Sequence, residues 1–298
     1  MHIPQVAGDP SLLPTAPETK RVNPLLEREG MTTTLNLAPA PWVLKQCGET
    51  GFVFLENPPG YESLKEEFAW EVSWHQEVER RKTAEPARYA FSASVKKFRS
   101  QVLKRNKVRS LANKFIRRIQ SPAVHLLDMG CGSGGLLESV IATLPASIGA
   151  RCVPHGIELS TELARVADDN LGRLGGRCVH DNALNGLTHF PPEYFDLIIM
   201  SSFLEHEINP LPLLRRCCER LREGGFIIIK VPNFSCLNRH LRAERWCGFR
   251  WPDHVNYFTP KTLQAMVKRA GLKVAQMSVL DRSPLSDNMY MVVQKPAQ

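Results

Sequence analysis

The sequence predicts an α/β protein with a mostly parallel central sheet, and three observations support this fold class. From residue 122 onward, short apolar runs of strand length alternate with segments of helical periodicity. A glycine-rich turn joins the first of these runs to a helical segment, and glycine allows the sharp backbone turn that such a junction needs. The 298-residue chain is 43% hydrophobic and 23% charged, which is the balance of a globular protein with a sizeable core.

Four segments precede the alternating region. Residues 1–36 hold several prolines and no sustained apolar period, so we expect a disordered leader, and Met31 offers an alternative translation start. Residues 41–59 contain two apolar runs around a glycine turn, which is typical of a β-hairpin. Residues 62–85, rich in Trp, Glu and Arg, predict helices. Residues 95–119 predict one long amphipathic basic helix, because apolar positions recur every three or four residues.

The alternating region has the order expected of parallel strands joined by crossover helices. The expected strands are VHLLDM at 124–129, VPHGIEL at 153–159, RCVHD at 177–181, FDLIIM at 195–200 and FIIIKVP at 226–232, with LKVAQMSVL at 272–280 and MYMVVQK at 289–295 closing the sheet. The expected helices begin at Gly134 and Ser160, span 210–223, and run from Thr259 to Ala270.

Positive charge is concentrated in two places. The formal net charge is +8, yet residues 95–119 hold ten Lys or Arg and no acid, which leaves 28 basic against 30 acidic residues elsewhere. For this helix we favour a solvated basic face opposite an apolar stripe that packs on the sheet domain. For a second cluster we favour contact with an anionic acceptor, such as a phosphorylated or lipid-linked sugar delivered from a membrane surface. That cluster consists of Arg239, His240, Arg242, Arg245 and Arg250, with Trp246 and Trp251 interleaved.

Composition also bears on location and partners. The chain has no uninterrupted apolar run of about 18 residues and no secretory signal pattern, so the cytoplasm is the expected location. The eight cysteines form no CxxC pair, so free and mostly buried thiols are expected. Nucleic acid is the less favoured partner, because no RNA-binding module precedes the α/β region. The oligomeric state stays open.

Acidic residues end three successive predicted strands around the glycine turn. In Leu126 to Gly135 the strand enters the turn through Asp128, while Glu158 and Asp181 end the next two strands. The glycines alone also fit the dinucleotide pattern GxGxxG. The position of Asp128, where a carboxylate can face a methionine amino group, favours a methyl donor, and Glu158 is placed to accept hydrogen bonds from ribose hydroxyls.

These motifs resemble, in order, those of the class I S-adenosylmethionine-dependent methyltransferases, and most closely the ubiquinone-biosynthesis-like, type 11 and type 23 group. The matching segments are LLDMGCGSGG, GIELS, HDNAL, FDLIIMSSFLEH and LREGGFIIIKVPN. The resemblance implies a Rossmann-like seven-stranded sheet at 122–298 whose last strand is antiparallel. A hairpin and helical cover at 37–121 would then precede it.

The resemblance also implies S-adenosylmethionine as the cofactor, bound along the ends of the first four strands. The implied contacts come from Asp128, Gly130, Cys131, Gly132, Glu158, Leu159, Asp181, Asn182 and Ser201.

Two histidines are candidate catalytic residues. A sulfonium methyl group is already activated, so the enzyme mainly aligns the acceptor, although an alcohol or phenol acceptor benefits from a general base. His206 follows the fourth strand in the segment SSFLEH, where an anchoring role in the loop is an equal alternative. His254 lies in an insertion at 233–257 that could roof the acceptor pocket, or it could fix the start of the helix at Pro260.

The expected reaction is methyl transfer to a small-molecule or carrier-linked acceptor, at oxygen, with transfer to nitrogen or carbon left open. We expect no metal site, because Ser202 stands where the related pattern carries an extra acid and Glu205 alone holds a cation poorly. The alternatives are a methyltransferase that acts on RNA or protein and, less favoured, a nicotinamide-dependent oxidoreductase. Against the latter, no second domain with a tyrosine–lysine pair is evident.

Overall fold

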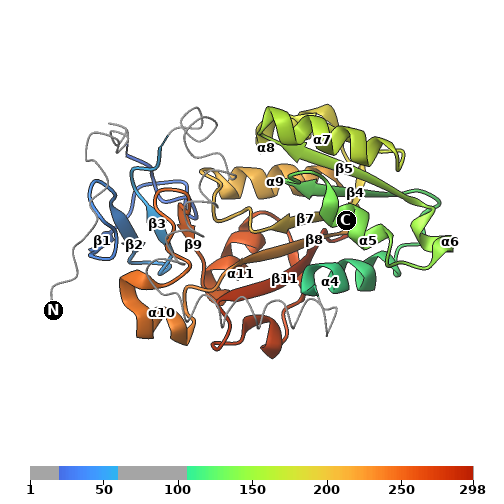
Figure 1. The fold of residues 1–298 in the computed structure, drawn as a ribbon. Coiled ribbons are helices and arrows are strands. Elements are labelled where there is room, and N and C mark those ends of the chain that lie inside the picture. The colour runs from blue at the N-terminus through green and yellow to red at the C-terminus, as the bar shows by residue number, and fades with distance from the viewer. Residues whose placement is uncertain (1–19, 60–105, 298) are drawn as a thin grey trace, which may run out of the picture.

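A computed structural model describes residues 20–59 and 106–297. Their main feature is a seven-stranded sheet in the order β10-β11-β8-β7-β4-β5-β6 (Figure 1). The strands from β8 to β6 in this order pair in parallel, while β11 is antiparallel to both of its neighbours. The strands are β4 (Val124–Met129), β5 (Cys152–Glu158), β6 (Arg177–His180), β7 (Phe195–Ser201), β8 (Leu221–Pro232), β10 (Lys273–Gln276) and β11 (Asn288–Gln294). The predicted fold class is thereby confirmed.

Helices cover both faces of this sheet. The helices of the described chain are α4 (Lys107–Ile116), α5 (Gly135–Ile141), α6 (Ala146–Gly149), α7 (Thr161–Gly172), α8 (Ala183–Gly186), α9 (Pro210–Arg220), α10 (Leu237–Arg242) and α11 (Pro260–Arg269), with 3-10 turns η2 (Leu187–His189), η3 (Ala243–Arg245) and η4 (Val279–Arg282). Alternate strand residues belong to different core clusters: Ile227 and Ile229 pack with α9 and α11, whereas Ile228 packs with α4 and α5. Strands buried on both faces explain the continuous apolar runs in the sequence.

A second, four-stranded sheet has the order β1-β2-β3-β9, and we call it the cover sheet. Its strands are β1 (Thr32–Leu35), β2 (Leu44–Cys47), β3 (Val53–Leu55) and β9 (Asn256–Tyr257). The antiparallel pair β2 and β3 confirms the predicted hairpin. Because β9 comes from the insertion, the cover sheet combines segments from both sides of the expected boundary at residues 121 and 122, and Figure 1 shows β9 beside β3.

The prediction of a disordered leader is wrong for residues 20–36. Leu25 is fully buried in the same core cluster as Phe52, and Arg21 donates to the backbone oxygen of Val255 at 3.2 Å. Leu25 is not part of a repeating pattern of apolar residues, so the local sequence does not predict its burial. Only the tertiary contact reveals it. Residues 1–19 lie outside the described chain.

The basic helix is described only from residue 106 onward. Asn106 caps α4 by accepting from the backbone N–H of Arg109, and Val108, Leu111 and Phe115 are buried against the sheet. This packing agrees with the favoured interpretation of the helix as a basic face opposite an apolar stripe. The predictions for 62–85 and for the first part of 95–119 fall outside the described residues.

The expected substrate contact of the tryptophan-containing cluster is wrong for Trp246. Its side chain is 1% exposed, and its Nε1 donates to Asp287 Oδ1 at 2.8 Å. Trp246 packs with Phe234 and Phe249 in a core beneath the cover sheet, because a large aromatic side chain with one polar atom can be buried once that atom is bonded.

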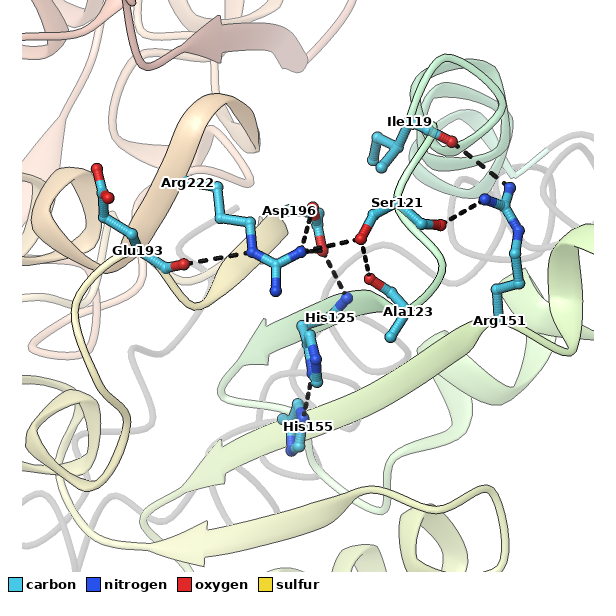
Figure 2. Close-up of polar contacts among 9 residues, drawn as sticks. All are labelled: Ile119, Ser121, Ala123, His125, Arg151, His155, Glu193, Asp196 and Arg222. Carbon is cyan, nitrogen blue, oxygen red and sulfur yellow. Dashed lines mark hydrogen bonds and ion pairs between the residues drawn. The ribbon is translucent and has the colours of Figure 1, made fainter.

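Polar contacts join the amino-terminal ends of β4, β7 and β8 to one another and to His155 of β5, as Figure 2 shows. Asp196 of β7 accepts from the backbone N–H of His125 in β4 at 2.8 Å and from Arg222 in β8 at 3.2 Å. His125 in turn lies 3.4 Å from His155 of β5, and burial lowers the pKa of His155 to about 4. These contacts hold the strands in register at the edge opposite their carboxyl ends, so we assign them a structural role.

No helix in the described part of the chain is long and apolar enough to cross a membrane.

Candidate active site

The carboxyl ends of β4, β5, β6 and β7 meet at one edge of the large sheet. The chain order reverses at β4, which pairs with β5 on one side and β7 on the other. In open α/β sheets, such a reversal leaves a crevice at the carboxyl ends, where ligands bind. The predicted cofactor residues all lie at these strand ends or in the loops that follow them.

The turn after β4 has room for a ligand on one side only. Gly130 and Gly132 have φ values of 65° and 55°, a conformation that favours glycine. A Cβ added to Gly130 would lie 2.8 Å from Cδ2 of Phe203, whereas one added to Gly132 would meet no atom of the described chain within 4 Å. The turn therefore packs on the loop after β7 at Gly130 and faces open space at Gly132.

Glu158 organises the backbone around this turn. Its Oε2 accepts from the N–H of Gly132 at 2.8 Å, and its Oε1 accepts from the N–H groups of Leu159 and Ser160 at 2.9 and 3.0 Å. The carboxylate thus joins the end of β5 to the glycine turn. Oε2 has a further lone pair, so Glu158 can also accept a hydrogen bond from a hydroxyl of a ribose.

Asp128 lies at the end of β4 and is 3% exposed. Burial and the negative charge of Glu158 raise the pKa of Asp128 well above its ordinary value. A buried carboxyl of this kind becomes an effective partner for a cationic group, because the cation restores the ionised form. The methionine ammonium of the expected cofactor is such a group.

The remaining predicted cofactor residues follow β5, β6 and β7. Asp181 Oδ1 accepts from the N–H of Asn182 at 2.7 Å, and Asn182 caps α8. Leu159 directly follows Glu158, and Ser201 ends β7 opposite Lys230 of β8. All four are only partly buried, so each has atoms accessible to a ligand.

Cys131 differs from its neighbours in the turn, because its side chain points into the protein. It is 7% exposed, and its Sγ lies 3.6 Å from Sγ of Cys178 in β6. The hydrogen bond to Cys178 and burial raise the pKa of the Cys131 thiol. The position therefore contributes packing, its backbone N–H donates to the oxygen of Ile157 at 3.3 Å, and its thiol remains protonated at neutral pH.

His206 is paired with an acid that sequence analysis did not select. Its Nδ1 lies 2.9 Å from Oδ1 of Asp253. Although burial opposes the charged form, the Asp253 carboxylate raises the pKa of His206 to about 9, and His206 lowers the pKa of Asp253 to about 2. The two side chains form a partly buried ion pair at neutral pH.

His254 is 4% exposed and packs edge-on against His206, with the ring centroids 4.6 Å apart. Its Nδ1 donates to the backbone oxygen of Gly248 at 2.8 Å, so its anchor is within the insertion and not at the start of α11. Burial lowers the pKa of His254 to about 3, which keeps this imidazole neutral. Thr259, not His254, caps α11.

Glu205, His206 and His254 are the residues here that could hold a cation. Each offers one potential ligand atom, and these atoms lie within 4.8 Å of one another. Asp253 favours the imidazolium form of His206, in which both ring nitrogens carry protons, so a metal ion would have to displace the proton on Nε2. The expectation of no metal site therefore stays a prediction.

Comparison with known proteins identifies the family. A family model described as a methyltransferase domain matches residues 87–277, which is more than half of the chain. The chain belongs to this methyltransferase family. The methyltransferase uses S-adenosylmethionine, and the alternative of a nicotinamide-dependent oxidoreductase is set aside.

Individual relatives of the methyltransferase have less than 30% sequence identity to it. A ubiquinone biosynthesis O-methyltransferase from Burkholderia pseudomallei is 28% identical over 177 residues, which are 55% of this chain and 71% of the relative. A protein of the same name from a Shewanella species is 27% identical over 173 residues, 54% of this chain and 68% of its own. Among solved structures, a methyltransferase from Bacillus halodurans aligns over 63% of this chain and 100% of its own length, with a TM-score of 0.46 and 14% identity.

Sequence reasoning missed two residues of this site. Phe203, which contacts Gly130, has the appearance of an ordinary core residue. Asp253 directly precedes the selected His254, yet its partner is His206, 47 residues earlier in the chain. An acid beside a candidate histidine is the only local signal, and it does not identify the partner.

Proposed function

We propose that this methyltransferase methylates an oxygen atom of a small-molecule or carrier-linked acceptor. The contact between Phe203 and Gly130 carries the proposal, because it packs the SSFLEH loop onto the glycine turn. His206 follows Phe203 by three residues, and its N–H donates to the oxygen of Phe203 at 3.0 Å, so we expect His206 beside the cofactor. A histidine there can take the proton of a hydroxyl acceptor. The O-methyltransferase names of two relatives support the same chemistry.

The strand-end residues would hold the cofactor. Glu158 would accept hydrogen bonds from the ribose hydroxyls, Asp128 would pair with the methionine ammonium, and Asp181 with Asn182 would meet the adenine amino group. Gly130 and Gly132 would keep the turn close to the ligand, with Cys131, Leu159 and Ser201 completing the wall. When bound, S-adenosylmethionine supplies an activated methyl group on a sulfonium.

The two histidines have different roles in the proposal. His206 is the candidate catalytic base, since it is 22% exposed and lies on the loop that borders the crevice. His254 is buried and contacts the His206 ring, so we propose that it supports His206 and does not touch the acceptor.

A peripheral membrane contact would bring a lipid-linked or anionic acceptor to this site. Large apolar side chains are exposed on α10 and on the segment 279–285, and the N–H of Leu237 donates to the oxygen of Pro284, which places the two segments side by side. They are Leu237, Leu241, Val279, Leu280 and Leu285. Arg239, Arg242 and Arg282 lie in the same segments, and apolar tips among basic residues suit an anionic lipid surface.

The test begins with calorimetric titration of S-adenosylmethionine, S-adenosylhomocysteine and NAD. We expect the adenosyl ligands to bind and Glu158→Ala to weaken them about 10- to 100-fold, which corresponds to ~1.5–3 kcal/mol for hydrogen bonds to a charged group. Glu162→Ala, an exposed acid on the neighbouring helix, is the matched control and should bind normally.

Acceptor chemistry is tested with matched probes. Catechol and hydroxybenzoate probes should yield S-adenosylhomocysteine, whereas the corresponding anilines should not. Turnover of anilines alone would contradict the choice of oxygen, and unchanged binding in Glu158→Ala would contradict the cofactor assignment.

A further inference from the structure

The side chain of His206 is held at one ring nitrogen by two oxygens of the same residue. Nδ1 lies 2.9 Å from Oδ1 of Asp253 and 3.0 Å from its backbone oxygen. Because both oxygens accept, the proton of a neutral His206 imidazole resides on Nδ1. No side chain or backbone group of residues 20–59 or 106–297 forms a hydrogen bond with Nε2. Nε2 is therefore the nitrogen that can exchange a proton with a bound molecule.

The plane of the His206 ring is also fixed. His254 meets it edge-on, with an interplanar angle of 86°. His254 itself is held by the hydrogen bond from its Nδ1 to Gly248. A ring that is bonded at one nitrogen and packed against a second ring has little freedom to turn, so the direction of Nε2 is set before any acceptor binds.

Asp253 is anchored by its own segment. The N–H of His254 donates to the oxygen of Arg250 at 2.7 Å, and the N–H groups of Val255 and Asn256 donate to the oxygen of Glu205 at 2.8 and 3.0 Å. The insertion is therefore hydrogen-bonded to the residue that directly precedes His206. This backbone connection keeps Asp253 opposite His206 although the two are 47 residues apart.

Asp253 has only one described partner for its carboxylate. The side chain is 12% exposed, and its Oδ2 is buried with no hydrogen bond from the described residues. The other charged or titratable groups that face His206 are Glu205, Arg250 and His254. Burial of a carboxylate is unfavourable unless a partner compensates for its charge, and here the partner is a single imidazole. This is the geometry of an acid that orients a catalytic histidine.

We propose that Asp253 is the positioning residue for His206 in methyl transfer, holding Nδ1 so that Nε2 receives the acceptor proton. This inference rests on the proposed O-methylation. The acceptor oxygen forms the new C–O bond, the C–S bond breaks with its electron pair left on sulfur, and the hydroxyl proton passes to Nε2. Asp253 stays ionised throughout and stabilises the imidazolium that results.

The pair predicts a distinctive pH profile. His206 must be neutral to accept a proton, and with its pKa raised to about 9 by Asp253, kcat should rise with pH until about pH 9. In Asp253→Asn the pKa of His206 falls, so the profile should reach its plateau at least one pH unit earlier. The plateau itself should be about 10- to 100-fold lower, with KM changed by less than about threefold, because the acceptor site is intact. Asp253→Glu should recover part of the rate.

Two measurements test the inference, both on the full chain. Titration of ¹⁵N-labelled histidines by NMR in the S-adenosylhomocysteine complex reports the tautomer and pKa of His206, which a His206→Gln spectrum assigns. Rate profiles from pH 6 to 10 with the fastest catechol or hydroxybenzoate probe report kcat and KM. Asp287→Asn is the control, since Asp287 bonds to Trp246 of the same insertion and does not contact His206.

The outcomes separate this inference from the proposed function. An Nε2–H tautomer in the neutral form, or a His206 pKa that Asp253→Asn leaves unchanged, would overturn the positioning role. So would a uniform loss of rate with an unshifted profile, which is what a purely structural contact predicts. So would equimolar Zn²⁺ shifting the resonances of both His206 and His254, because Nε2 would then be a metal ligand. If every phenol probe is inert, the proposed O-methylation fails, while the NMR titration still decides whether Asp253 holds Nδ1.

Discussion

At the scale of single residues, three acids around the site have three different environments. Asp128 is buried beside another carboxylate, so its pKa is raised. Glu158 accepts three backbone hydrogen bonds, and Asp253 forms an ion pair with His206, which lowers the pKa of Asp253. The same functional group is therefore suited to a cationic ligand, to ribose hydroxyls and to an imidazole, depending on its neighbours.

The ion pair between His206 and Asp253 predicts how stability depends on pH. The pKa of His206 is raised from 6.5 to about 9, so its contribution is full below about pH 6.5 and is lost as pH rises through about 9. The pKa of Asp253 is lowered from 3.8 to about 2, so its contribution is full above about pH 3.8 and is lost as pH falls through about 2.

Urea unfolding of wild type and Asp253→Asn across this range measures the effect. We expect the difference in unfolding free energy to be largest between about pH 4 and 6.5, at ~1–3 kcal/mol, and to shrink toward pH 9. Glu205, Arg250 and His254 face the pair in both proteins, so their effects on the unfolding free energy cancel in the difference. A difference that is constant with pH would rule out the ion pair as its source.

At the scale of elements, two loops define the site together. The glycine turn after β4 and the SSFLEH loop after β7 touch at Gly130 and Phe203. The turn has the positive φ values that its glycines allow, and the contact packs the turn against the loop that leads to His206. Neither loop would present the same surface without the other.

Two alanine substitutions in the turn separate packing from ligand binding. In Gly130→Ala the new residue must adopt a left-handed backbone conformation, and its Cβ would lie 2.8 Å from the Phe203 ring. The substitution should therefore lower stability by ~2–3 kcal/mol. In Gly132→Ala only the backbone conformation is strained, because the new Cβ would contact no described atom, so the free energy of unfolding should fall by ~1 kcal/mol. Both should weaken S-adenosylmethionine binding more than tenfold, as measured by thermal melting and calorimetric titration. Full affinity in Gly132→Ala would show that the open space beside it is not the cofactor site.

At the scale of the whole molecule, the insertion between β8 and α11 links several parts. It supplies β9 to the cover sheet, Asp253 to His206, and α10 to the exposed apolar surface. Arg21 and Leu25 from the start of the described chain pack onto the same region, through Val255 and the Phe52 cluster respectively. The cover and the catalytic sheet are thus one packed unit around the site.

The exposed surface of α10 and residues 279–285 predicts binding to anionic membranes. Wild type should co-sediment with phosphatidylglycerol-containing vesicles and not with pure phosphatidylcholine, less so at high salt. The double variant Leu241→Asp, Leu280→Asp should lose this binding, because it removes two apolar tips and adds negative charge. Leu174→Asp, an exposed leucine after α7, is the control. Equal binding by the double variant would exclude this surface.

The sequence by itself determined the fold class, the order along the chain of the strands and helices of the large sheet, and the positions of Asp128, Glu158 and Asp181 at strand ends. These features depend on local periodicity and on rules that place parallel strand ends at one edge. The burial of Leu25 and Trp246, the addition of β9 to the cover sheet and the pairing of Asp253 with His206 were decided by tertiary structure alone. They join residues far apart in the chain, and no local pattern specifies which distant partner a side chain will meet.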